Sequence, residues 1–133
     1  MKLIFCVDEN NGMMFMDKRQ SQDRVLRKRI LEIVGKNKLW MSKYSSEQFD
    51  FFWTRRVSDD YMSRADEDDY CFIEDKDYSV ENVSEIILCN WNRAYPATRY
   101  FDVDLSACGF ERVSTEELVG SSHDKITLEI YRR

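Results

Sequence analysis

The residues best suited to chemistry in this chain stand where helices are expected to begin. Lys43 and Ser45 follow the short apolar run 38–41 and open a helical stretch. A helix N-terminus presents free N–H groups and the positive end of its dipole, and a nearby cation and hydroxyl add to both. The pair therefore fits a phosphate or carboxylate site. Ser45 and Gln48 also have the spacing of an ordinary capping box, which leaves a purely structural role open.

A second candidate is Asp23, in the first turn of a helix expected from Gln20 to Val34. Ser21 is the predicted N-cap of this helix and Gly35 the residue just past its end. The helix places its apolar residues on one stripe, formed by Leu26, Ile30, Ile33 and Val34. The helix dipole favours an acid at this position whatever its function, so a structural role for Asp23 stays open.

Other catalytic and metal-binding combinations are missing from the sequence. The only histidine, His123, lies in a Gly-Ser-Ser-His-Asp turn, where an exposed side chain is expected, and no zinc site can be assembled around it. The four cysteines form no C-x-x-C pair and are predicted to be small buried hydrophobes in a reducing compartment. We find no P-loop, no dinucleotide glycine motif and no Ser/His/Asp set with convincing spacing, and we predict no metal.

The elements that position these residues alternate between strand and helix. Continuous apolar runs at 2–7, 70–73 and 85–91 are typical of strands covered on both faces. The segments 110–117 and 126–132 predict a terminal hairpin, the second with alternating apolar and polar residues. The sequence therefore predicts an α/β fold with three layers, built on a mixed, mostly parallel sheet with a C-terminal antiparallel hairpin. Residues 1–133 are expected to form one domain.

Two regions allow more than one interpretation. Met13 to Met16 is either a loop that folds its methionines over a pocket or a plain second strand. Between 49 and 85 the pattern is irregular, with a short strand expected at 55–57, one or two helical turns within 59–65, and a short helix or turn at 80–83.

Composition limits the kinds of partner. Aliphatic, aromatic and cysteine residues make up 43% of the chain and charged residues 34%, with a net charge of −5. No apolar run approaches the roughly 20 residues that span a bilayer, and the N-terminus does not resemble a signal peptide, so we expect a cytoplasmic protein. The acidic balance makes nucleic acid an unlikely partner. Nine bases between 18 and 43 and thirteen acids between 47 and 85 form a dipole that can steer a charged partner.

The order of these segments resembles the bacterial dihydrofolate reductase family. The resemblance rests on three stretches: Leu3 to Gly12, with its Asn-Gly turn into a mobile loop; Met41 to Glu47, similar to the family's "M-G-R-x-T-x-E-S" element; and Ser84 to Glu117, with "T-x-Y-F-x-x-D" followed by "G-F-E-R-V-S". It implies the family's fold, in a shortened and divergent form.

The same resemblance implies roles for individual residues. Asp23 stands for the carboxylate that holds and helps to protonate a pterin ring, and Lys43 and Ser45 stand for the Arg and Thr that bind NADPH phosphate. Ser42 replaces the family glycine of that element. Glu74 and Asp75 stand where the family has a Gly-Gly pair beside the pyrophosphate, and two carboxylates there would repel it.

Three hypotheses follow. The first is a degenerate reductase-like domain without hydride chemistry or cofactor, which binds a small ligand or a protein partner near Asp23, Met13, Met14, Lys43 and Ser45. The second is a divergent NADPH-dependent reductase of a pterin-like substrate that uses Asp23. The third is a protein-interaction module that docks through the basic helix face formed by Arg24, Arg27 and Lys28 or through the acidic middle segment. A shortened fold also leaves apolar surface open, so self-association is expected.

Overall fold

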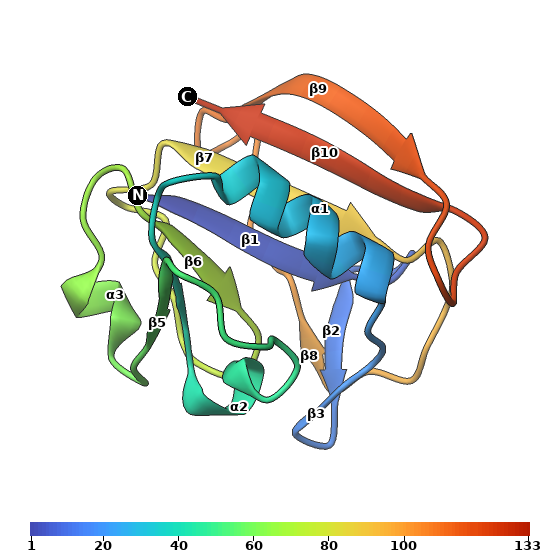
Figure 1. The fold of residues 1–133 in the computed structure, drawn as a ribbon. Helices are drawn as coiled ribbons and strands as arrows, with labels where there is room; N and C mark the ends of the chain where they lie inside the picture. Colours follow the sequence, from blue (N-terminus) through green and yellow to red (C-terminus); the bar gives the residue numbers. More distant parts are fainter.

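A computed structural model of residues 1–133 contains one twisted, seven-stranded sheet (Figure 1). In spatial order its strands are β5 (Arg55–Val57), β4 (Leu39–Met41), β6 (Tyr70–Ile73), β1 (Lys2–Val7), β7 (Glu85–Asn90), β10 (Ile126–Arg132) and β9 (Glu111–Leu118). The first five are parallel, whereas β10 runs antiparallel to both β7 and β9. The predicted mixed, mostly parallel sheet with a C-terminal antiparallel hairpin is confirmed.

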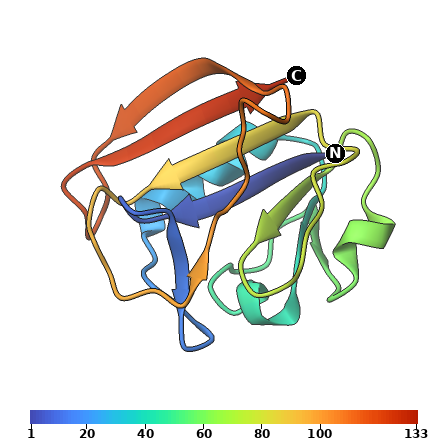
Figure 2. The ribbon, with the colours of Figure 1, turned by 180° about the vertical axis from the view of Figure 1, so that it is seen from behind.

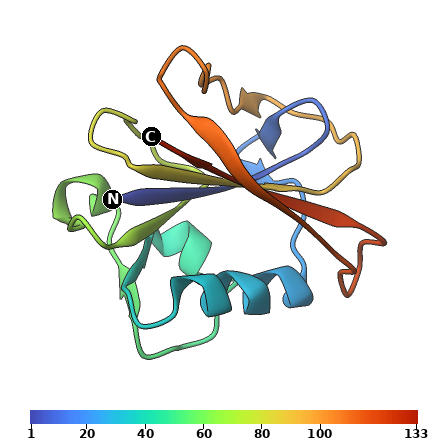
Figure 3. The ribbon, with the colours of Figure 1, turned by 90° about the horizontal axis from the view of Figure 1, so that it is seen from above.

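The sheet separates two apolar cores, because successive side chains of a strand point to opposite faces. On β1, Leu3, Phe5 and Val7 enter one core and Ile4 enters the other. The Ile4 core is covered by α1 (Arg24–Val34), the only long helix, through its buried Leu26, Ile30 and Val34. Figure 3 shows α1 on one side of the sheet and a layer of loops and short strands on the other.

The layer opposite α1 contains a second, small sheet instead of a helix. Its strands are β3 (Lys18–Arg19), β2 (Gly12–Phe15) and β8 (Arg99–Tyr100). Figure 2 shows this sheet and the connection from β8 toward β9 lying across that face. Met16 and Asp17 have positive φ values of 50° and 64° and form the two-residue turn between β2 and β3. Of the two interpretations of the methionine segment, the strand is therefore correct.

Both helices begin at residues other than those that the sequence pattern indicated. Helix α1 starts at Arg24, not Gln20, and its N-cap is Asp23, not Ser21; Gly35 ends it as expected, with φ 59°. The reason is that the Asp23 carboxylate accepts the N–H groups of Val25 and Leu26, which fixes the first turn there. Helix α2 (Lys43–Ser46) is likewise capped by Ser42, so the predicted box of Ser45 and Gln48 does not form.

The middle of the chain, between residues 49 and 85, contains little regular secondary structure, as its pattern indicated. It holds β5, one turn of helix in α3 (Tyr61–Arg64) and a turn without helix at 80–83. All four cysteines are free; Cys71 and Cys89 are buried, whereas Cys6 and Cys108 are partly exposed. No helix is both long and apolar enough to cross a membrane.

The packing of α1 predicts a large loss of stability when its central residue is shortened. Ile30 is 1% exposed in the core between α1 and the sheet. Its replacement by Ala should lower the free energy of unfolding by about 2–5 kcal/mol, because a cavity remains where the side chain packed. Urea unfolding measures this. Glu32→Ala, at an exposed site on the same helix, is the control and should change stability by less than about 0.5 kcal/mol; equal effects would contradict the packing described.

Candidate ligand site

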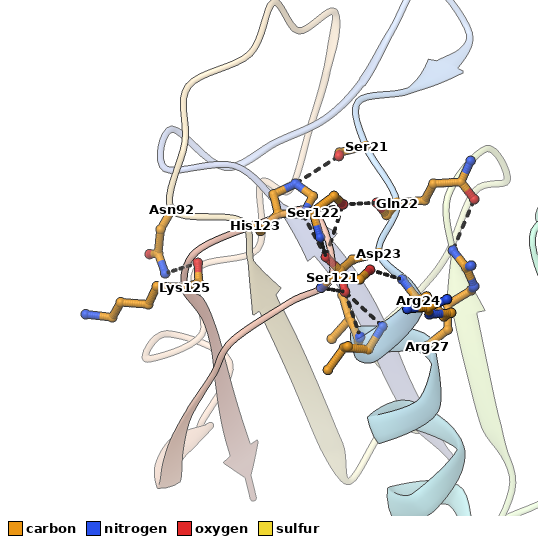
Figure 4. Close-up of polar contacts among 12 residues, drawn as sticks. Ser21, Gln22, Asp23, Arg24, Arg27, Asn92, Ser121, Ser122, His123 and Lys125 are labelled. Carbon is orange, nitrogen blue, oxygen red and sulfur yellow. Dashed lines mark hydrogen bonds and ion pairs between the residues drawn. The ribbon is translucent and has the colours of Figure 1, made fainter.

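The Asp23 carboxylate lies at the junction of α1 and the loop between β9 and β10, and the chain itself satisfies it completely. One oxygen, Oδ1, accepts the main-chain N–H groups of Val25, Leu26 and Ser121 at 2.9–3.1 Å. The other, Oδ2, accepts the N–H and hydroxyl of Ser122 at 2.9 and 3.2 Å and lies 3.0 Å from Nδ1 of His123 (Figure 4). The carboxylate of Asp23 is 0% exposed.

This environment keeps Asp23 ionised. Burial alone would raise its pKa, but the hydrogen bonds from Ser122, His123, Ser121 and Leu26 lower that pKa far below its ordinary value. The approach of the loop is close, since a Cβ on Gly120 would collide with the Asp23 carboxylate. The loop therefore needs glycine at this position.

His123 is buried, which corrects the expectation of an exposed turn residue. Its side chain is 2% exposed, and its ring stacks on Trp91 with 4.5 Å between ring centroids. Its second nitrogen, Nε2, lies 2.9 Å from the Ser21 hydroxyl and 3.3 Å from the Tyr95 hydroxyl. No local sequence signal predicts this cluster, because Asp23 and His123 are 100 residues apart.

At the start of α2, two carboxylates of the chain accept hydrogen bonds from the groups that were expected to bind a phosphate. Asp75 accepts the hydroxyl of Ser42 at 2.6 Å, and Asp59 accepts the main-chain N–H of Lys43 at 3.0 Å. Ser45 is fully buried, and its N–H is donated to Ser42 at 3.1 Å. The structure thus brings Lys43 and Ser45 to the end of β4 as expected, with only the Lys43 side chain exposed.

The neighbouring Glu74 forms an ion pair with Arg19 in the same region. Both of its carboxylate oxygens accept from Arg19 at 3.1 Å, and Gln48 donates to one of them at 3.0 Å. The Arg19 guanidinium also lies over the Tyr44 ring, 4.3 Å from its centroid. Glu74 is only 6% exposed, so this pair fixes the end of β6 against β3 and α2.

An open pocket of about 360 Å³ lies beside these clusters. Its lining residues come from the β2–β3 hairpin, the segment after it and the connection after β7: Phe15, Met16, Lys18, Arg19, Gln20, Tyr95 and Pro96. The Oε1 atom of Gln20 is buried there without a hydrogen-bond partner, while its Nε2 donates to Asp8 at 3.0 Å. Met13 and Met14, by contrast, are 5% and 2% exposed in the core and do not line the pocket.

The Asp23 cluster predicts an acid-sensitive contribution to stability. Asp23→Ala should cost about 3–5 kcal/mol, because it removes the cap and leaves buried donors unpaired. Since the folded pKa of Asp23 lies below its ordinary value of 3.8, the contribution is complete above about pH 4 and is lost as the pH falls. Urea unfolding from pH 3 to pH 7 measures this. Gln22→Ala, on an exposed neighbour, is the control, and an equal cost for both variants would refute the cluster's role.

Comparisons with known proteins support the fold at the level of structure. No protein-family model and no curated protein sequence matches the chain. Among solved structures it is similar to a dihydrofolate reductase from Enterococcus faecalis complexed with NADP(H) and RAB-propyl, with a TM-score of 0.66 and 15% sequence identity. The match covers 99% of this chain and 95% of that one. The chain therefore has the fold of dihydrofolate reductase.

Proposed function

We propose that this domain has lost the hydride transfer of the reductases and binds a small ligand in the 360 Å³ pocket beside Gln20 and Tyr95. The observation that carries the proposal is the saturation of Asp23. Its two oxygens receive six contacts from the chain's own donors, so neither is free to hold a pterin ring. A proton could reach a substrate from Asp23 only after the β9–β10 loop had moved away.

The cofactor half of the reductase site gives independent support. A dinucleotide phosphate would have to displace Asp59 from the Lys43 N–H and Asp75 from the Ser42 hydroxyl. The negative charge of these carboxylates would also repel the phosphate. Lys76 offsets this charge only in part, with its Nζ 3.8–3.9 Å from an oxygen of each carboxylate. A carboxylate already in place competes directly with a phosphate for the same donors. These contacts disfavour the alternative of a divergent NADPH-dependent reductase.

The pocket itself favours a flat ligand that carries a hydrogen-bond donor. It lies beyond the carboxyl ends of β1 and β7, where ligands commonly bind in open α/β sheets. The rings of Phe15 and Tyr95 offer apolar surface, and the unpartnered Oε1 of Gln20 can only accept. The four free thiols fit a cytoplasmic, reducing setting.

Thermal unfolding with three probes tests this proposal. Millimolar NADPH and dihydrofolate should leave the melting temperature unchanged, whereas benzamide, a flat ring with an N–H donor, should raise it. Saturation at about 100 times the dissociation constant adds roughly 2.7 kcal/mol, which is a shift of several degrees in a small domain. Gln20→Leu should abolish the benzamide shift and Gln22→Leu should keep it. A shift with NADPH, followed by its oxidation in a turnover assay, would restore the reductase hypothesis.

A second candidate function is self-association through an aromatic surface. Trp53 and Phe51 are 88% and 78% exposed. Trp53 borders a second cavity of about 480 Å³, lined also by Leu31, Gly35, Lys36, Phe52 and Thr54. We propose that the Trp53 side chain of one copy inserts into this cavity of a second copy across a two-fold axis, which would form a homodimer.

Sedimentation velocity measures this association directly. The wild-type chain should sediment increasingly as a dimer as its concentration rises from about 1 to 100 μM, the range of weak interfaces. Trp53→Ser should stay monomeric, because it removes the aromatic anchor. Tyr100→Ser, at a residue that is 51% exposed on β8, is the matched control and should behave as the wild type. A wild-type monomer at every concentration would rule the dimer out.

A further inference from the structure

The side chains of Ser21, His123 and Asp23 together have the geometry of an activated hydroxyl. The Ser21 hydroxyl lies 2.9 Å from Nε2 of His123, and the Asp23 carboxylate lies 3.0 Å from Nδ1 (Figure 4). A hydroxyl on one ring nitrogen and a carboxylate on the other is the arrangement that turns serine into a nucleophile. Both Ser21 and Asp23 precede α1, while His123 arrives from the β9–β10 loop.

The protonation of His123 follows from its neighbours. An ionised carboxylate can only accept, so the Nδ1 that faces Asp23 carries the proton. In the neutral ring, Nε2 is then a lone-pair acceptor aimed at the Ser21 hydroxyl. Stacking on Trp91 and the buried hydrogen bonds to Asp23 fix the plane of the imidazole, so the base is held ready.

The Ser21 hydroxyl is connected to the open pocket through two lining residues, Gln20 and Tyr95. Ser21 is partly exposed and directly follows Gln20, which lines the pocket. Tyr95, another lining residue, contacts the same His123 nitrogen at 3.3 Å. The main-chain N–H groups of Ser21 and Gln22 make no hydrogen bond within the chain, so they are free to donate to a developing oxyanion.

We propose that Ser21 is a catalytic nucleophile for acyl transfer, with His123 as its general base and Asp23 as the residue that positions His123. The substrate class is a small ester whose acyl group enters the Gln20–Tyr95 pocket, so the inference rests on the ligand pocket of the proposed function. No cofactor takes part, and the activity differs from hydride transfer in every reacting atom.

The reaction balances without any external co-reactant except water. The Ser21 oxygen attacks the ester carbonyl carbon as its proton moves to Nε2 of His123. The bond from carbonyl carbon to alkoxy oxygen then breaks, and the imidazolium returns the proton to the departing alcohol. Water repeats the sequence on the acyl-serine, which releases a carboxylic acid and restores the Ser21 hydroxyl.

A fluorophosphonate probe tests the nucleophile on the full chain. Attack by Ser21 would form an O–P bond with loss of fluoride, and intact mass spectrometry should find one adduct per chain, mapped to Ser21. Ser21→Ala and His123→Gln should lower the labelling rate about 100-fold or more. Ser114→Ala, at an exposed serine of β9, is the matched control and should retain labelling.

The outcomes separate this inference from the proposed function. Circular dichroism confirms that each variant is folded before labelling is compared. An unlabelled wild-type chain, or equal labelling of the wild type and Ser21→Ala, overturns the nucleophile. Benzamide binding, followed by melting temperature, reports on the pocket alone. A chain that binds benzamide without being labelled would support the proposed function and contradict the acyl-transfer inference. Labelling at Ser21 without benzamide binding would support the acyl-transfer inference and contradict the proposed function.

Discussion

The junction between α1 and the β9–β10 loop depends on the hydrogen bonds that the buried carboxylate of Asp23 accepts from both. A carboxylate with no solvent contact is tolerated only when its lone pairs are filled, and here donors from α1 and from the β9–β10 loop fill them. The two groups of donors belong to segments at opposite ends of the chain. Their shared acceptor therefore sets where α1 begins and how the loop that carries His123 lies against it.

A second set of carboxylates works in the same way at the other end of the site. Asp59, Glu74 and Asp75 each bind a donor group of the protein at or near α2. The donors at the start of α2 are therefore occupied by the chain's own side chains. The pocket between the β2–β3 hairpin and the chain after β7 is open to solvent.

Periodicity was sufficient to predict the sheet but not the site. Apolar runs such as 2–7 and 70–73 are long, local signals, and both proved to be strands. The helix start was misplaced because Ser21 and Asp23 are both good caps, and the donors that favour Asp23 come from residues 121 and 122. His123 was misjudged for the same reason, since a turn sequence is exposed by default unless distant segments cover it. The resemblance at the level of the fold was correct. The sequence also showed that carboxylates at 74 and 75 depart from the family pattern, but it did not predict that Arg19 and Ser42 would bind them.

The 100-residue separation between Asp23 and His123 has a consequence for the way this chain is made. During synthesis the N-terminal segments leave the ribosome before the C-terminal ones exist, and a domain generally folds as a unit. Helix α1 can be capped by Asp23 at that stage, but the carboxylate has no cover until the β9–β10 loop has been translated. The nascent protein therefore exposes a charged helix start that the finished protein buries, and release of the last strands completes its assembly.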